Sequence, residues 1–147
     1  MRKVRRSALV QHSASDMFSL VDDVESYPEF LPWCKSAVVH LRESNLVEAT
    51  LGLQRAELSK QFRTRNLATG KETIDMSLVD GPFRHLEGRW RFTQLGESGS
   101  KVELNLDFEF SSSMIDVLFG PFFEEVCNSL VDAFTRRADD VFGKGAQ

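Results

Sequence analysis

Hydrophobic and polar residues alternate with a period of two over most of the middle of the chain. The alternation covers residues 37–42, 47–54, 62–65, 73–78, 86–92 and 101–110, and it is most regular in the last stretch. There, Val102, Leu104, Leu106, Phe108 and Phe110 occupy one phase, and charged or amide side chains occupy the other. This period is typical of a β-strand with one face buried and one face in water. Residues 4–10 form a further short strand before these stretches. We therefore predict seven strands.

Short polar segments separate the last six of these strands, at residues 44–45, 55–57, 69–70, 80–82 and 96–99. Connections of this length join antiparallel neighbours, so we expect an antiparallel sheet. Two short helices are predicted between the first two strands. Ser13 and its polar neighbours cap a helix that ends by about residue 24, and residues 26–33 form one turn that leads into the second strand.

Residues 113–142 change to the helical period and form one long amphipathic helix. Its apolar stripe consists of Ile115, Phe119, Phe122, Phe123, Val126, Cys127, Leu130, Ala133 and Phe134. Pro121 lies inside this helix, which must therefore kink there or restart. A sheet with one apolar face and a helix with one apolar stripe bury each other, so we expect a single α+β domain over residues 1–147, with a curved sheet around the helix.

The composition favours an apolar interior, because the chain has 12 Phe and one Tyr and most of its aromatic rings therefore carry no polar group. A net charge of −4 disfavours a strongly basic nucleic-acid binder, and we expect no DNA partner. The apolar run after the basic start spans only residues 8–10, so neither a secretory signal nor a membrane span is expected. Two cysteines without CxxC spacing indicate a reducing cytoplasm.

The sequence offers no recognisable catalytic or metal-binding constellation. Motifs for dinucleotides, phosphates, zinc proteases and serine hydrolases do not occur, and His12, His40 and His85 lack the ligand spacing of a zinc site. We expect these histidines to be solvated. Cys127 falls in the apolar stripe of the helix, where a thiol is usually inert. We therefore expect no metal, no required cofactor and no enzymatic activity.

Four arginines share the outer phase of two strands that have one strand between them: Arg63, Arg65, Arg89 and Arg91. One interpretation is a surface that binds RNA phosphates. The other is a set of cross-strand ion pairs, because Asp75 and Glu103 share that phase on neighbouring strands. The acidic net charge favours the second interpretation.

The inner phase collects large apolar side chains from the sheet and the helix. A plain core is the default interpretation. However, seven strands curled around one helix enclose more volume than a domain of this length usually fills, and proline breaks lie at the expected rim. We therefore predict a cavity for a hydrophobic ligand between sheet and helix. Its predicted lining is Trp33, Phe62, Met76, Phe83, Trp90, Phe92, Phe108, Phe119, Phe123, Val126 and Leu130.

Several segments resemble one protein family. Residues 24–34, VESYPEFLPWC, resemble a signature of the coenzyme-Q-binding START-domain family, within the wider polyketide cyclase/START-like superfamily. Residues 76–83 (MSLVDGPF), 86–92 (LEGRWRF), 106–110 (LDFEF) and 131–138 (VDAFTRRA) are similar to the same family. The resemblance implies the helix-grip fold, in which a seven-stranded antiparallel sheet holds the C-terminal helix.

The resemblance implies two functions. One branch of the family binds ubiquinone in a hydrophobic tunnel and supports respiration without catalysis. Another branch consists of bacterial ribosome-association toxins, which bind the large ribosomal subunit and block its joining to the small one. Apolar residues carry the resemblance, so we expect binding of ubiquinone or a related polyprenyl lipid in the bacterial cytoplasm, with transient contact at the inner-membrane surface. Ribosome binding is the alternative.

Overall fold

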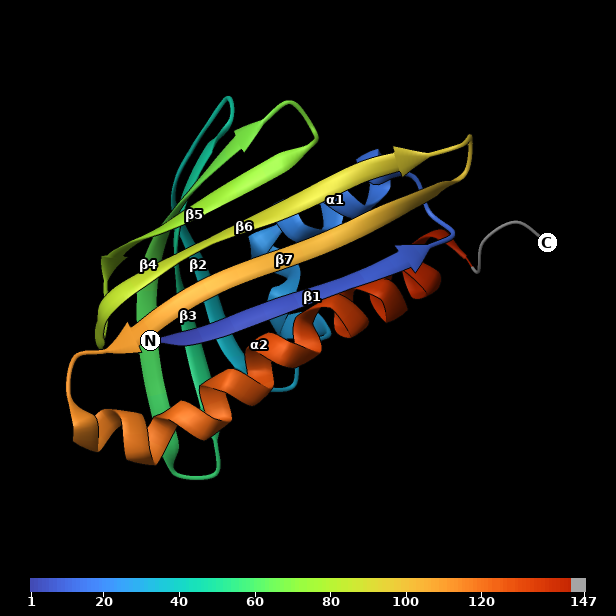
Figure 1. The fold of residues 1–147 in the computed structure, drawn as a ribbon. Helices are drawn as coiled ribbons and strands as arrows, with labels where there is room; N and C mark the ends of the chain where they lie inside the picture. The colour runs from blue at the N-terminus through green and yellow to red at the C-terminus, as the bar shows by residue number, and fades with distance from the viewer. Residues whose placement is uncertain (144–147) are drawn as a thin grey trace.

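The computed structural model describes residues 1–143 and contains one seven-stranded antiparallel sheet with three helical segments (Figure 1). The strands are β1 (Arg2–Val10), β2 (Cys34–Glu43), β3 (Leu46–Arg55), β4 (Leu58–Thr69), β5 (Thr73–Asp80), β6 (Phe83–Leu95) and β7 (Gly99–Phe110). The helices are α1 (Ala14–Asp22), the 3-10 helix η1 (Val24–Glu29) and α2 (Ser113–Phe142). The spatial order β1-β7-β6-β5-β4-β3-β2 is an antiparallel meander with β1 added beside β7. The predicted helix-grip fold is confirmed.

Several strands run well beyond the stretches that alternate in the sequence. β4 is the clearest case, because alternation predicts residues 62–65 and the strand spans Leu58–Thr69. Residues 58–61 are all exposed. They belong to a hairpin that projects past the core, where neither face is buried and no apolar alternation is needed.

The sheet is strongly bent around α2. Figure 1 shows β2, β3 and β4 running across the direction of β1 and β7, with α2 against the inner side. Irregular register occurs in the pairs β2–β3, β4–β5 and β6–β7, and such bulges increase the local twist of a strand. Gly88 contributes on the inner face, because a Cβ at this position would lie 2.6 Å from Leu106 Cδ1. The curved sheet therefore has no room for a side chain at position 88.

A serine side chain caps the start of each α-helix, and Ser13 is the cap that the sequence predicts for the first. Ser13 Oγ accepts a hydrogen bond from the Asp16 amide at the start of α1, and Ser112 Oγ accepts one from the Ile115 amide at the start of α2. α2 continues through Pro121 without restarting, and Figure 1 shows it changing direction within its first turns. The helix was expected either to kink at Pro121 or to restart there, and the structure has the kink.

The buried residues form two adjacent clusters. One surrounds the C-terminal half of α2, where the Phe134 ring lies 5.4 Å from Tyr27 and 5.5 Å from Trp90. The other surrounds the N-terminal half, where Phe123 lies 4.9 Å from Phe108. Among the helices of residues 1–143, none is long and apolar enough to cross a membrane.

Candidate functional site

A cavity of about 80 Å³ lies between the concave face of the sheet and α2, where the two apolar clusters meet. Strands β3 to β7 form its wall on one side, and α2 closes it on the other. Val24 and Tyr27 of η1, together with Trp33, close a third side. The cavity therefore lies at the position that the sequence predicts, between sheet and helix.

Seven of the eleven predicted lining residues border the cavity: Trp33, Phe62, Met76, Trp90, Phe123, Val126 and Leu130. The other four are a correction to the prediction. Phe92 packs against Phe18 of α1, with ring centroids 5.7 Å apart. Phe83, Phe108 and Phe119 are buried in the phenylalanine cluster around Phe123. These four side chains point to the inner side as predicted. They lie where the sheet extends beyond the cavity, and there they pack against other side chains.

The prediction missed twelve further residues of the cavity wall, among them small and polar side chains. The cavity wall also includes these residues: Val24, Tyr27, Ala49, Leu51, Leu53, Thr64, Asn66, Leu86, Leu104, Leu106, Cys127 and Phe134. Most of them could have been found by continuing the alternation along each strand. On β4 that phase runs from Phe62 through Thr64 to Asn66.

Thr64 and Asn66 place hydrogen-bonding groups on this otherwise apolar wall. The Thr64 hydroxyl donates to Asn66 Oδ1 at 3.1 Å. No lysine, arginine, aspartate or glutamate borders the cavity within residues 1–143. The site is thus apolar, uncharged and equipped with one polar pair.

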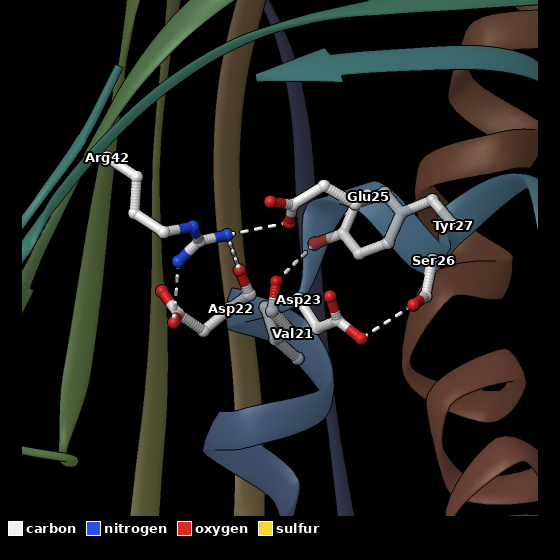
Figure 2. Close-up of polar contacts among 7 residues, drawn as sticks. All are labelled: Val21, Asp22, Asp23, Glu25, Ser26, Tyr27 and Arg42. Atoms are coloured by element: carbon white, nitrogen blue, oxygen red, sulfur yellow. Dashed lines mark hydrogen bonds and ion pairs between the residues drawn. The ribbon is translucent and has the colours of Figure 1, made fainter. Parts of the chain in front are cut away.

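Tyr27 borders the cavity, but its hydroxyl already has a partner. Figure 2 shows the Tyr27 hydroxyl directed at the carbonyl oxygen of Val21, to which it donates a hydrogen bond. Burial raises the pKa of Tyr27 far above its ordinary value. Tyr27 is therefore neutral at physiological pH, and its proton is engaged.

A cluster of ion pairs holds η1 in place beneath the sheet. Arg42 reaches from β2 to Asp22 Oδ2 at 3.2 Å and to Glu25 Oε1 at 2.7 Å (Figure 2). Arg42 also donates a hydrogen bond to the carbonyl oxygen of Asp22, and Ser26 Oγ donates one to the Asp23 carboxylate. These contacts join the end of α1 to η1, so they fix the segment that presents Tyr27 to the cavity.

Neither cysteine is prepared to act as a nucleophile. Burial raises the pKa of the Cys34 thiol to about 11 and raises that of Cys127 still further. Both groups are therefore thiols at neutral pH, whereas the thiolate is the reactive form. In residues 1–143 no group of three or more His, Cys, Asp or Glu side chains is arranged to hold a metal ion.

The histidines include one that is not solvated as predicted. His12 is only 6% exposed, and its Nε2 lies 2.8 Å from Asp139 Oδ1 near the end of α2. The turn after β1 folds under α2, which the alternation in the sequence does not reveal. His40 contacts Thr50 at the exposed face of β2 and β3, and His85 is partly exposed next to Glu87.

The arginines of the convex face are largely paired with acids. Glu48 of β3 lies between the two arginines of β4, 2.6 Å from Arg63 and 3.1 Å from Arg65. The hydrogen bond from Arg65 lowers the pKa of Glu48 below its ordinary value. Arg89 pairs with Asp75 at 2.6 Å, as the cross-strand interpretation predicts. Arg91 lies opposite Glu103 in register, but within residues 1–143 no ion pair joins them.

An open groove borders the cavity on the outside. Pro32, Gln54, Phe122 and Ser129 are among its lining residues, and Trp33 and Val126 border both the groove and the cavity. These two side chains are therefore the barrier between the cavity and the solvent on this side.

Residues 10–135 match the family described as "Polyketide cyclase / dehydrase and lipid transport". The chain is 52% identical to a "Ribosome association toxin RatA" of Vibrio cholerae, with 98% of this chain and 100% of the relative covered. It is 42% identical to the protein of the same name in Escherichia coli K12, over 97% of this chain and 90% of the relative.

A more distant relative is the "Coenzyme Q-binding protein COQ10 homolog B, mitochondrial" of Xenopus laevis, 29% identical over 94% of this chain and 58% of the relative. Among solved structures, a START superfamily protein from Mycobacterium smegmatis matches with a TM-score of 0.77 and 22% identity, over 95% of this chain and 98% of that one. The Zhui aromatase/cyclase from a Streptomyces species matches with a TM-score of 0.77 and 18% identity, over 99% of both chains. At these identities the two structures support the fold alone.

Proposed function

The chain belongs to the polyketide cyclase / dehydrase and lipid transport family, and from this premise we propose that it binds a neutral hydrophobic ligand between the sheet and α2. The proposed ligand is ubiquinone or a related polyprenyl lipid, carried in support of respiration without catalysis. The observation that carries the proposal is the cavity wall, in which apolar side chains from both sheet and helix surround a space, with no charged residue in the described part of the chain bordering it.

The absence of charge from the described wall limits the ligand chemistry. An ionised group in an apolar site is costly unless an opposite charge pairs with it. A fatty-acid carboxylate or a phosphate would lose its water in this cavity and find no cation among the lining residues. A quinone ring or an isoprenoid chain has no such cost.

The ligand must enlarge the cavity when it binds. Pockets for small molecules typically have volumes of about 300–1,000 Å³, whereas this cavity has about 80 Å³. Two features permit expansion. Met76 is an unbranched, adaptable side chain in the wall, and Trp33 with Val126 forms the barrier to the outer groove. We infer that the ligand enters between Trp33 and α2.

The chemistry of the wall supports a carrier that is not an enzyme. General acid–base catalysis needs a group that exchanges protons near the working pH. The pKa values of Tyr27 and Cys127, both of which border the cavity, are raised by burial, and the Tyr27 proton is already donated to Val21. Neither side chain is suited to transfer a proton to a bound ligand.

We further propose that the carrier receives its ligand at the cytoplasmic surface of the inner membrane. Met114 and Val117 are each 71% exposed and Leu118 is 61% exposed, all in the first turns of α2. Apolar side chains in such a group suit insertion into the edge of a bilayer. Vesicle co-sedimentation tests this: Val117→Ser with Leu118→Ser should reduce binding, and equal binding of variant and wild type would refute it.

Mass spectrometry of an organic extract of the purified protein tests the carrier function. We expect an isoprenoid or quinone in the extract, or its uptake when ubiquinone is offered. Ala49→Leu adds three carbon atoms to the cavity wall and should prevent uptake while the protein stays folded. Thr50→Leu is the matched control, because it changes the opposite face of the same strand. If wild type takes up no isoprenoid or quinone at all, the proposal is wrong.

Association with the large ribosomal subunit is the second candidate function, in which the chain would block subunit joining. It is favoured by relatives at 40–52% identity that are named ribosome association toxins. The convex arginines would contact RNA phosphates, and this surface lies on the opposite face from the cavity, so the two functions are compatible. Co-sedimentation with large subunits should weaken with salt and with alanine at Arg63, Arg65, Arg89 and Arg91. Absence of association at low salt would eliminate this candidate.

A further inference from the structure

We propose that Asn66, oriented by Thr64, donates a hydrogen bond to an uncharged oxygen of the ligand and so selects an oxygenated ligand over a plain hydrocarbon. The inference rests on the proposed function, because it concerns the ligand of the same cavity. It deepens that function by naming the residue that recognises the polar end of the ligand.

The position of Asn66 in the sheet directs its side chain toward the cavity. It occupies the inner phase of β4, opposite Val47 on one neighbouring strand and Met76 on the other. Thr64, two residues before it, lies opposite Ala49 and Leu78. The polar pair is thus surrounded by apolar cross-strand neighbours, and both members border the cavity.

The hydrogen bond between the two side chains leaves the donors of Asn66 available. The Thr64 side chain is 7% exposed, and its hydroxyl donates to Asn66 Oδ1 at 3.1 Å. Because Oδ1 is the acceptor of this bond, the two N–H donors of Asn66 Nδ2 remain, and within residues 1–143 they have no hydrogen-bond partner. Asn66 is half-buried, and Arg63 Nε is the one fully enclosed side-chain nitrogen or oxygen without a partner in the described residues, so Asn66 Nδ2 keeps accessible surface for a hydrogen-bond acceptor.

A purely structural role does not account for this pair. Polar groups facing an apolar interior destabilise the fold unless they are fully hydrogen-bonded, and the other wall positions of β3, β4 and β7 are filled by apolar residues. An amide with two unused N–H donors at such a position is suited to donate a hydrogen bond to a bound ligand.

The Asn66 amide and the uncharged described wall limit which ligand atom can accept the hydrogen bond. An amide N–H group donates to carbonyl and ether oxygens, and no cation lines the described wall to balance an anion. The ligand group is therefore a neutral oxygen on an otherwise apolar molecule, such as a quinone carbonyl, a ring ketone or a methoxy group.

Calorimetric titration with two probes tests the inference. One probe is a dimethoxybenzoquinone with a ten-carbon tail, and the other is an alkylbenzene with the same tail and no oxygen. Wild type should prefer the quinone, and Asn66→Leu should weaken quinone binding by roughly 3–10-fold, the range for one net hydrogen bond. The same variant should bind the alkylbenzene at least as tightly as wild type. Thr64→Val removes the orienting hydroxyl and should reduce the preference for the quinone over the alkylbenzene less than Asn66→Leu does.

The melting temperature of the ligand-free protein separates recognition from a structural role. Asn66→Leu should melt at the same temperature as wild type or higher, because it replaces an amide by an apolar side chain in an apolar wall. A lower melting temperature together with an unchanged preference for the quinone would overturn the inference and leave the carrier function intact. If wild type binds neither probe, the proposed function fails, and this inference fails with it.

Discussion

On the concave face of the sheet the described residues around the cavity are uncharged, whereas on the convex face arginines and acids alternate across neighbouring strands. The contrast is sharpest on β4, which presents Phe62, Thr64 and Asn66 to the cavity and Arg63 and Arg65 to the outside. A shift of register by one residue would exchange the two sets. The comparison indicates that the inner face suits a neutral ligand, while most of the positive charge outside is already balanced.

The largest effect should come from placing a charge on the inner side. Val126→Glu buries a carboxylate beside a cavity that has no cation among its lining residues in the described part of the chain, and we expect a loss of about 3–5 kcal/mol in the free energy of unfolding at neutral pH. Ligand uptake should be lost as well. Urea denaturation followed by circular dichroism measures the first effect.

The pH dependence of this variant has a definite sign. Burial should raise the pKa of the new carboxyl in the folded state, so the deficit relative to wild type is largest at high pH and shrinks as the pH falls toward about 5. Ser129→Glu, on the groove side of the same helix, is the control and should show a much smaller deficit. An equal deficit in the two variants would contradict the claim that the cavity wall tolerates a charge less well than the groove does.

A bound ligand should protect the thiol of Cys127, which borders the cavity. In a Cys34→Ser background, a thiol reagent should label the native protein slowly, because burial raises the pKa of Cys127 and the reagent needs an opening of the structure. Quinone at about nine times its Kd should slow the labelling by about tenfold, because only the ligand-free tenth of the molecules then reacts. Labelling that is unaffected by a ligand shown to bind would place the ligand elsewhere.

The smallest effect concerns the ion pairs of the convex face. The pKa of Glu48 is lowered from 4.5, first by the hydrogen bond from Arg65, so the stabilisation by Glu48 is present above pH 4.5 and is lost as the pH falls through the lowered pKa. Glu48→Gln should therefore be less stable than wild type at neutral pH, and the difference should disappear in acid. Melting temperatures measured across this range test it, and a difference that persists in acid would argue against the ion pairs as its cause.

Most of the architecture could be predicted from the sequence, because alternation specifies both the strands and the side of each residue. The phase placed Phe62, Trp90 and Val126 on the inner side correctly. It could not distinguish Trp90, which borders the cavity, from Phe92, which packs against α1, since that depends on how the elements cross in space.

The polar residues were harder to predict for a different reason. A search for large apolar side chains passes over Asn66 and Thr64, although they share the phase of Phe62. His12 was expected in solvent because the sequence does not show that its turn packs against Asp139, more than a hundred residues later. Long-range contacts of this kind come from the closure of the sheet on α2.

A competition experiment shows whether the cavity selects a neutral ligand over an anionic one. Native mass spectrometry of the protein with an equimolar mixture of a short-chain ubiquinone and a fatty acid of equal carbon number measures which ligand the cavity accepts. We predict that the quinone adduct dominates at neutral pH, because the cavity wall within residues 1–143 has apolar surface and an amide donor but no cation. A dominant fatty-acid adduct, or no adduct with either ligand, would contradict it.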